Sequence, residues 1–582
     1  MIRHASWTTL AQQQAAQFGN KSAYIFLENG EHIGETITYQ GVDMRARALA
    51  ARLQTLCSPG DRVLLVYDSC IENMIAFFAC LYAGLTAVPV CPPHRNRRNA
   101  RLENILTDCN PRLALSTAEQ MAEIELHSNH DSLTQRVAWL ATDTLSLTEA
   151  DAWREPTCSH DTLAFLQYTS GSTSTPKGVA VSHGNLLHNQ AMLQHAFKTT
   201  EHSTIVSWLP IFHDMGLIGQ LLHAFYTGAT CVFMSPMSFL QQPARWLNAM
   251  SKYKGDISGG PNFSYSLCEK KIPEDLLQEL DLSSWRVAIN GAEPVQRHTL
   301  EAFSRRFAGC GFQKKAFYPG YGMAEATLII SGGSPGEEPV YRWVDKKELR
   351  KDNVVSSLPF APSAQPLVGC GIRILDETIV IVNVKTSQPC PDDQIGEIWV
   401  AGKHVAQGYW GRQEATRDTF QAYLNDGRGP FLRTGDLGFL KDGTLFVAGR
   451  LKDVIILQGA KHYPHDIESS IQAMIPALRP EGVATVGITS PTGEQVVVVA
   501  ELQREMLRKG DLKSVANSIR RVVSEDHGLA LHDVVLIRPG TLPKTTSGKI
   551  QRQLCGDLYL TDGFQVCHQA GVHPTGMGVA AS

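Results

Sequence analysis

Apolar runs of strand length alternate with longer amphipathic patterns over the first 330 residues of the chain. The runs RVLLVY, TAVPV, LAFLQY, TIVSWL, TCVFM and RVAING are separated by segments in which apolar residues recur at helical spacing. Strands that alternate with helices in this way are typical of parallel sheets covered by helices. The pattern predicts α/β subdomains over about residues 1–330.

The pattern changes twice in the second half of the chain. Short alternating segments such as TIVIVNV and GEIWVAG, separated by Gly and Asp turns, predict a small antiparallel β-barrel over about 367–449. Beyond residue 453, helical patterns near 466–477 and 512–524 and the strands VATVGI, QVVVVAEL and DVVLI predict a small α+β domain. The Gly- and Ala-rich end, from about residue 560, predicts weak order.

Composition narrows the class of protein. A chain of 582 residues exceeds what one hydrophobic core supports, and 43% hydrophobic with 19% charged residues is typical of soluble globular proteins. A formal net charge of −4 without a long basic run argues against a nucleic-acid partner. The 13 cysteines include no CxxC pair, so neither a zinc knuckle nor a disulfide framework is expected, and a cytoplasmic location fits.

One segment, Met74–Cys91, approaches the length of a membrane span. Gly84, Thr86 and Pro89 interrupt it, so we expect a buried helix that ends near Gly84 and a short core strand after it. The N-terminal residues lack the apolar core of a secretion signal. No membrane span is expected.

The segment YTSGSTSTPKG, residues 168–178, has the composition of a loop that binds a polyphosphate. Gly171 and Gly178 permit backbone conformations that expose N–H groups, the hydroxyls add donors, and Lys177 adds a positive charge. The Ser and Thr residues precede the lysine, so this is not a Walker A motif, and a solvated linker is the alternative. The predicted nucleotide-binding residues here are Thr169, Ser170, Gly171, Ser172, Thr173 and Lys177.

Six further segments follow in a fixed order. They are WLPIFHDMGL at 208–217, NGAEPV at 290–295, YPGYGMAEAT at 318–327, LRTGDLGFL at 432–440, GRLKD at 449–453 and LPKTTSGKIQR at 542–552. Together with the hydroxyl-rich loop they resemble the core motifs of the adenylate-forming, or acyl-activating, superfamily over nearly the whole chain. The resemblance implies ATP and Mg²⁺ as cofactors, an adenylation domain at 1–449, a hinge at 450–453 and a mobile C-terminal domain at 454–582.

Residue roles follow from the resemblance and from the chemistry of an adenylate. Glu325 is the expected Mg²⁺ ligand, since nucleotide-bound magnesium takes one or two carboxylates, although a solvated glutamate is the alternative. Asp436 is expected to accept both ribose hydroxyls with help from Arg450, although a lone Gly-Asp is usually a turn. The resemblance implies that Tyr321 and the backbone of Gly291, Ala292 and Glu293 bind adenine, although a core tyrosine and a plain turn are the alternatives; Gly322 and Met323 are further expected nucleotide-binding residues.

Charged residues complete the predicted site. Lys549 matches the family's catalytic lysine, which stabilises charge that develops between the carboxylate and the α-phosphate. His213 is expected close to the carboxylate and phosphates, together with Asp214, and not as part of a zinc site. Lys452 matches the hinge position, although a surface lysine there has the same sequence signature.

Within the superfamily the chain resembles the fatty acyl-AMP ligases. The segments AVPVCPP, WLPIFHDMGLIG, SPMSFLQQPARWL and ISGGPNFSY carry this resemblance, with a long insertion at about 331–366. It implies a medium- or long-chain fatty acid substrate and transfer to a separate holo-acyl carrier protein or a polyketide or nonribosomal synthase carrier domain. The apolar residues expected either to form the alkyl wall or to be plain core are Phe212, Met215, Met237, Phe239, Phe263 and Tyr265.

Two other hypotheses stay open at this point: a fatty acyl-CoA synthetase that shares the first step, and a non-catalytic regulator that binds nucleotide or acyl chains. A serine hydrolase is excluded because the GxSxG match at Gly332–Gly336 places Pro335, which has no N–H, after the serine. Acyl chain length, the identity of the carrier and the oligomeric state are not determined by the sequence.

Overall fold

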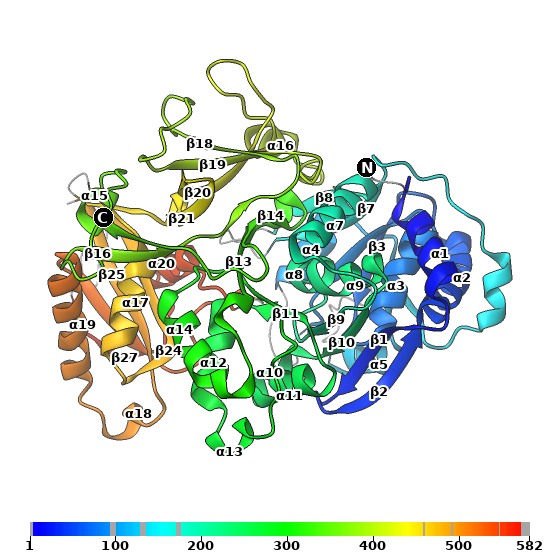
Figure 1. The fold of residues 1–582 in the computed structure, drawn as a ribbon, viewed down its shortest axis with the longest axis horizontal. Coiled ribbons are helices and arrows are strands. Elements are labelled where there is room, and N and C mark those ends of the chain that lie inside the picture. Colours follow the sequence, from blue (N-terminus) through cyan, green and yellow to red (C-terminus); the bar gives the residue numbers. More distant parts are fainter. Residues whose placement is uncertain are drawn as a thin grey trace, which may run out of the picture.

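The computed structural model describes residues 4–93, 100–127, 136–169, 176–457, 460–490, 493–545 and 548–571 (Figure 1). Its first α/β layer is a six-stranded sheet with the order β6-β5-β3-β4-β7-β8, parallel except for the β7–β8 pair. The strands are β3 (Arg62–Val66), β4 (Thr86–Val90), β5 (Leu113–Ser116), β6 (Ala138–Ala141), β7 (Leu163–Tyr168) and β8 (Gly178–Ser182). Its helices are α2 (Tyr39–Leu56), α3 (Ile71–Tyr82), α4 (Ala100–Cys109) and α5 (Ala118–His127).

The second sheet has nine strands in the order β17-β14-β13-β12-β11-β9-β10-β1-β2 and is parallel from β1 to β13. Its strands are β1 (Ser22–Glu28), β2 (His32–Thr38), β9 (Thr204–Ser207), β10 (Thr230–Met234), β11 (Ile257–Gly260), β12 (Val287–Asn290), β13 (Phe317–Gly322), β14 (Ile329–Gly332) and β17 (Ile372–Arg373). Its helices are α1 (Trp7–Phe18), α7 (His183–Phe197), α9 (His223–Thr227), α10 (Pro236–Gln241), α11 (Ala244–Lys252), α12 (Asn262–Lys271), α13 (Glu274–Leu277) and α14 (Arg297–Phe307). The predicted α/β body with parallel-rich sheets is confirmed.

Helix α3 joins the two sheets through its buried aromatic residues. Its Phe77 lies edge-on to Phe165 of β7, with ring centroids 5.6 Å apart, and Phe78 meets Phe225 of α9 at 4.6 Å. The helix ends at Tyr82 and β4 follows at Thr86, as the interrupted apolar run predicted. Among the described residues, no helix is both long and apolar enough to span a bilayer.

The next segment is antiparallel. Its main sheet has the order β18-β19-β20-β21, and β15 pairs with β16 within the expected insertion. The elements are β15 (Tyr341–Asp345), α15 (Lys346–Leu349), β16 (Ala364–Val368), β18 (Thr378–Val382), β19 (Gly396–Ala401), α16 (Gln413–Phe420), β20 (Leu432–Lys441) and β21 (Thr444–Arg450). The short strand-like segments of the sequence therefore form antiparallel pairs.

The C-terminal part is a smaller α+β unit with apolar clusters on both faces of a four-stranded sheet, β24-β25-β26-β27. Its elements are β22 (Ile455–Leu457), β23 (Ala460–His462), α17 (Pro464–Met474), β24 (Leu478–Ser490), β25 (Gly493–Leu502), α18 (Met506–Lys509), α19 (Leu512–His527), β26 (Asp533–Ile537), α20 (Arg552–Leu560) and β27 (Val566–Gln569).

The prediction of weak order from about residue 560 is wrong for residues 561–571, because β27 pairs with β26. Residues 572–582 lie outside the described residues. The Gln569 side chain also donates to Asp533 Oδ2 at 2.6 Å. Strand β27 covers an edge of the buried β26 that would otherwise expose unpaired backbone groups, an advantage that composition does not reveal.

A buried acidic residue lies where the antiparallel sheet meets the body. Glu377 accepts a hydrogen bond from the Ile374 N–H at 2.6 Å, its other oxygen lies 3.3 Å from His404 Nε2, and both side chains are fully buried. Burial raises the pKa of Glu377 to about 8 and lowers the pKa of His404 to about 3. Both groups are therefore neutral at pH 7, which avoids burying a charge.

Stability is expected to fall with rising pH because of this glutamate. The folded-state pKa is raised above the unfolded value, so its contribution is fully present below about pH 4.5 and is lost as the pH rises through about 8. The slope from this group is at most about 1.4 kcal/mol per pH unit. In urea unfolding between pH 5 and 9, Glu377→Gln should show a flatter profile than the wild type. A surface control, Glu414→Gln, should keep the wild-type slope, and equal slopes in all three proteins would contradict the assignment.

Candidate active site

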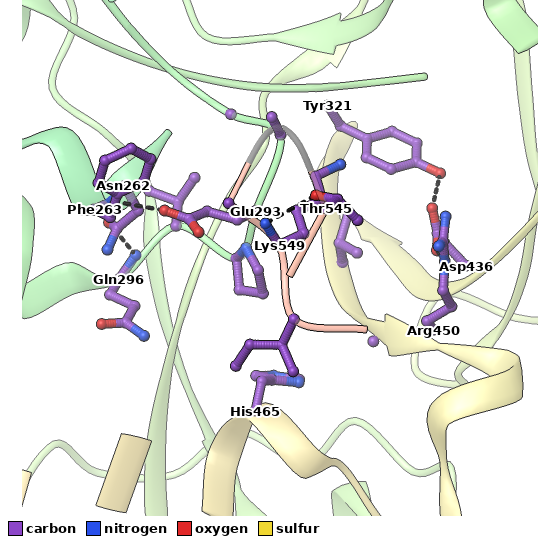
Figure 2. Close-up of a pocket in the computed structure, with 18 of the residues that line it drawn as sticks. Asn262, Phe263, Glu293, Gln296, Tyr321, Asp436, Arg450, His465, Thr545 and Lys549 are labelled. Atoms are coloured by element: carbon purple, nitrogen blue, oxygen red, sulfur yellow. Dashed lines mark hydrogen bonds and ion pairs between the residues drawn. The ribbon is translucent and has the colours of Figure 1, made fainter. Parts of the chain in front are cut away.

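A cavity of about 2020 Å³ opens between the body and the C-terminal unit (Figure 2). It collects the predicted site residues from distant parts of the chain. Those that line it are Thr169, Lys177, His213, Gly291, Ala292, Glu293, Tyr321, Gly322, Met323, Glu325, Asp436, Arg450, Lys452 and Lys549. Ser170, Gly171, Ser172 and Thr173 lie outside the described residues.

The carboxyl ends of parallel strands build one wall of the cavity. Gly291 and Ala292 follow β12, and Tyr321 lies in the neighbouring β13, so both segments reach the same edge of the sheet. Ala292 adopts a left-handed backbone conformation at φ 66°, and Glu293 accepts a 2.6 Å hydrogen bond from the Phe263 N–H that holds this turn in place. At position 322 a Cβ atom would lie 1.9 Å from the Leu328 carbonyl oxygen, so only glycine fits.

Asp436 is placed to bind a diol. Tyr321 donates to its Oδ2 at 2.8 Å and Arg450 donates to its Oδ1 at 3.2 Å, and Asp436 pairs with Arg450 in the β20–β21 register (Figure 2). The neighbouring Asp436 charge raises the pKa of Arg450, so this guanidinium stays charged. A carboxylate has about four acceptor positions, which leaves room for two hydroxyl donors beside Tyr321 and Arg450.

Glu325 faces cations across the cavity. It lies in the 3₁₀ turn η5 (Ala324–Ala326), and its Oε1 accepts a 2.8 Å hydrogen bond from the Tyr409 hydroxyl. Lys177 Nζ lies 4.6 Å from the centroid of the Tyr409 ring. Burial raises the pKa of Glu325. The pKa of Lys177 is lowered, mainly by burial and to a smaller extent by the positive charge of the nearby Lys452. One carboxylate opposite lysines suits a magnesium–phosphate group, in which phosphate oxygens supply most of the metal ligands.

His213 and Asp214 form a close pair at the start of a helical segment. His213 Nδ1 lies 2.8 Å from Asp214 Oδ1, and the Met215 N–H donates to the same oxygen at 2.7 Å. Burial acts to raise the pKa of Asp214, but His213 and Lys549 outweigh it and lower the pKa overall. The described residues contain no cluster of three or more His, Cys, Asp or Glu side chains suited to a metal. That His213 and Asp214 do not belong to a zinc site stays a prediction.

Lys549 reaches the cavity from the C-terminal unit. Its N–H donates to Thr545 Oγ1 at 3.1 Å, and the Thr545 N–H donates back to the Lys549 carbonyl at 2.7 Å, so the lysine projects from a compact turn (Figure 2). Burial lowers its pKa, while Asp214, Asp436 and Glu293 act in the opposite direction. Asp214 and Asp436 therefore favour the charged ammonium, whereas burial raises the pKa of Glu293 itself to about 8.

Polar contacts hold the C-terminal unit in this orientation. Gln296 donates to Ser469 Oγ at 3.1 Å across the boundary, and Lys461 Nζ lies 2.7 Å from Asp352 Oδ2 of the insertion. Next to Lys452, Asp453 pairs with Arg552 at 3.1 Å. These contacts fix the geometry in which Lys549 and Asp436 share one cavity.

The alkyl wall was predicted only in part. Phe212, Met215 and Phe263 line the cavity, but the other three candidates do not. Met237 is 57% exposed, Phe239 stacks on Trp208 inside the core, and the hydroxyl of buried Tyr265 donates to the Ile289 carbonyl. Apolar residues that were not predicted also line the cavity: Leu193 and Phe197 of α7, Ile289 of β12, Tyr318 of β13, and Leu328.

Sequence reasoning also missed Tyr409. Its ring approaches Lys177 and its hydroxyl binds Glu325, although these residues are separated by 84 or more positions in the chain. The isolated GYWG segment around it has no spacing that indicates a site. The wall residues of α7 had a weak signal, since Leu193 and Phe197 are four residues apart on one helix face.

Comparison with known proteins gives consistent matches over the whole chain. The family model described as "AMP-binding enzyme" matches residues 11–410, and "Disco-interacting protein 2-like, AMP domain" matches residues 452–569. The medium-chain-fatty-acid [acyl-carrier-protein] ligase JamA of Moorena producens is 41% identical, covering 95% of this chain and 94% of the relative. The long-chain-fatty-acid AMP ligase FadD32 of Mycobacterium marinum is 35% identical, with 96% and 94% covered.

Solved structures agree with these relatives. The fatty acyl-adenylate ligase from L. pneumophila, in complex with acyl adenylate and pyrophosphate, superposes with a TM-score of 0.77 at 38% identity and covers 98% of both chains. A structure from work on the fatty acyl-adenylate ligases of E. coli and L. pneumophila gives a TM-score of 0.87 at 30% identity, with 97% of this chain and 99% of that chain covered.

Tyr409→Phe is expected to weaken the site without dismantling it. The variant keeps the ring next to Lys177 but removes the donor to Glu325, and hydrogen bonds to charged groups contribute about 1.5–3 kcal/mol. Adenylate formation should fall about tenfold and require more Mg²⁺, measured as pyrophosphate release across a magnesium titration. Tyr423→Phe, at a side chain that is 55% exposed, serves as the control. A Tyr409→Phe enzyme with the wild-type magnesium profile would contradict the role of the hydroxyl.

Proposed function

The chain belongs to the AMP-binding enzyme family and, within it, to the fatty acyl-AMP ligases, and from this premise we propose a two-step reaction. In the first step the enzyme uses ATP to convert a medium- or long-chain fatty acid into fatty acyl-AMP and pyrophosphate. In the second step the acyl group passes to the phosphopantetheine thiol of a separate acyl carrier protein. The observation that carries the proposal is that Lys549 shares one cavity with the Tyr321–Asp436–Arg450 cluster and Glu325.

The first step needs charge neutralisation and alignment. A carboxylate oxygen of the acid forms a bond to the α-phosphorus, the bond to the bridging oxygen breaks, and the electron pair leaves with pyrophosphate. Asp436 binds the ribose hydroxyls, the turn at Gly291–Glu293 and Tyr321 bind adenine, and Lys549 stabilises the charge that grows on the α-phosphate and carboxylate oxygens. The lysine acts as a fixed cation in a site from which bulk water is displaced.

Magnesium fits the opposite side of the cavity. Bound there, Mg²⁺ supplies charge neutralisation at the phosphate oxygens, with Glu325 as its protein ligand. Tyr409 orients Glu325 by its hydrogen bond, while Lys177 and Lys452 add positive charge toward the leaving pyrophosphate. The hydroxyl-rich residues Ser170 to Thr173 are proposed to bind the same phosphates.

In the second step, the thiol sulfur attacks the acyl carbonyl and AMP departs. The acyl-carrier-protein ligase JamA, at 41% identity, supports a carrier protein as acceptor over CoA. The C-terminal unit, connected through the hinge at Lys452, is proposed to move between the two steps. The thirteen free cysteines support a reducing compartment, for which we propose the cytoplasm.

The acceptor is tested by incubating the enzyme with ATP, Mg²⁺ and labelled dodecanoate, and then adding either CoA or a holo-acyl carrier protein. We expect acyl-AMP that persists with CoA and disappears when the acyl group is transferred to the carrier. Ready formation of acyl-CoA would identify a CoA synthetase. The absence of adenylate with every acid tested would favour a regulator that only binds nucleotide or acyl chains.

Lys549→Ala is expected to slow acyl-AMP formation about a thousandfold, since a preorganised cation acts mainly on the transition state. ATP affinity, measured by equilibrium binding, should change only a few fold. The control is Lys513→Ala, which removes an exposed lysine of α19. Normal turnover in Lys549→Ala would refute the assigned role.

A further inference from the structure

Apolar side chains line one part of the cavity beside the nine-stranded sheet, which we call the acyl arm. Leu193 and Phe197 of α7, Ile289 of β12 and Tyr318 of β13 line it together with Leu328. These side chains carry no charge, and Phe197 and Tyr318 are almost fully buried. The arm therefore suits an alkyl chain whose carboxylate lies near Lys549.

The geometry of helix α7 gives an estimate of the length of this arm. In the middle of the helix Asn189 donates to the carbonyls of Ile329 at 3.1 Å and Ala326 at 3.4 Å, which places it beside the Glu325 turn. Leu193 and Phe197 follow on the same helix face at intervals of four residues. Eight residues at 1.5 Å each place Phe197 about 12 Å farther along the helix axis.

Strand β12 of the sheet gives an independent estimate of the length of the arm. Strand β12 has Gly291 after its last residue and Arg286 before its first, and Arg286 donates to the Phe197 carbonyl at 2.6 Å. Phe197 therefore lies at the edge where the strands begin, opposite the edge that holds the adenylate site. Four strand residues span about 13 Å. An extended alkyl chain advances about 1.2 Å per bond, so the length estimated from the helix and the length estimated from the strand each correspond to about ten bonds.

Aromatic rings close the far end. Phe197 lies perpendicular to Tyr318 at 5.1 Å between ring centroids and perpendicular to His223 at 5.7 Å. His223 is held at 2.8 Å by both Gln190 and Thr199, and burial lowers its pKa to about 3, so it stays neutral. The wall behind Phe197 is thus packed and hydrogen-bonded.

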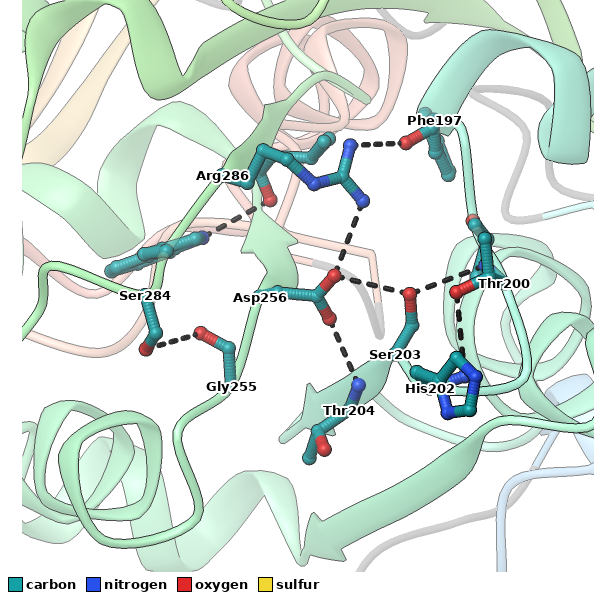
Figure 3. A network of polar contacts seen from close by, with 12 residues as sticks. Phe197, Thr200, His202, Ser203, Thr204, Gly255, Asp256, Ser284 and Arg286 are labelled. Carbon is teal, nitrogen blue, oxygen red and sulfur yellow. Dashed lines mark hydrogen bonds and ion pairs between the residues drawn. The ribbon is translucent and has the colours of Figure 1, made fainter.

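A polar network fixes the position of Phe197 (Figure 3). The Asp256 carboxylate accepts from the Thr204 N–H at 2.9 Å, from Ser203 Oγ at 3.1 Å and from Arg286 Nη2 at 3.1 Å. The other terminal nitrogen of Arg286 binds the Phe197 carbonyl. The fork of the guanidinium therefore ties the last residue of α7 to the starts of β9, β11 and β12.

We propose that Phe197 and Tyr318 form an aromatic stop that ends the acyl arm, and that Arg286 acts as the positioning residue that holds this stop in place. The stop selects straight-chain acids of about ten to twelve carbons and excludes hexadecanoate. This assignment deepens the proposed function and rests on it for the chemistry at the carboxylate.

The test measures the preference for acyl chain length in two ways. One is adenylate formation, and the other is thermal stabilisation of the protein by octanoate, dodecanoate or hexadecanoate without ATP. In Phe197→Ala the ratio of kcat/KM for hexadecanoate to that for dodecanoate should rise at least about tenfold, since pocket discrimination between alkyl lengths is of this order or larger. The stabilisation profile should shift toward hexadecanoate in parallel. Phe303→Ala is the matched control, because Phe303 is equally buried but lies in α14 and does not line the cavity.

Arg286→Lys tests the positioning role without opening a cavity. It retains the charge but loses the fork, so it should broaden the length profile by lowering the KM for hexadecanoate. A folded Phe197→Ala enzyme with the wild-type length profile overturns the stop, even if adenylate forms normally. If binding shifts toward hexadecanoate but no protein forms adenylate, the stop holds and the proposed reaction fails.

Discussion

The ammonium of Lys549 is the group on which the rest of the site depends. Desolvation in the cavity is unfavourable for this charge, and the carboxylates of Asp214 and Asp436 offset that cost from two segments of the body. Because Lys549 belongs to the C-terminal unit, the contacts between that unit and the body bring the lysine into the same cavity as Asp436.

The polar and apolar regions of the cavity lie toward opposite edges of the sheet. Polar groups gather at the carboxyl ends of β12 and β13 and on the facing β20–β21 pair, whereas apolar side chains follow α7 and the strands toward their starting edge. An amphipathic acid can satisfy both regions only when its carboxylate lies at the polar end. The direction of the parallel strands thus fixes the orientation of the substrate.

Local signals in the sequence predicted much of the fold and the polar site. Ser182 caps α7 through a reciprocal capping box with Asn185, and the parallel strands occur where apolar runs were found. Residues whose roles depend on long-range contacts were not predictable. Tyr409 meets Glu325 only after the antiparallel segment packs on the α/β part of the body. Met237 and Tyr265 are apolar or aromatic like Phe212 but lie outside the cavity. Strand β27 gains its order from the open edge of β26 and not from its own composition.

The most direct measurement is a crystal structure of the enzyme with a dodecanoyl-AMP ester. We expect adenine to lie against Tyr321, both ribose hydroxyls to bind Asp436, and Lys549 to lie next to the acyl phosphate. We expect the alkyl tail to run between α7 and the sheet to Phe197. A tail that leaves the cavity by another route, or an adenylate bound while Lys549 lies far from the phosphate, would contradict the central claim that this cavity is assembled for fatty acyl-adenylate formation.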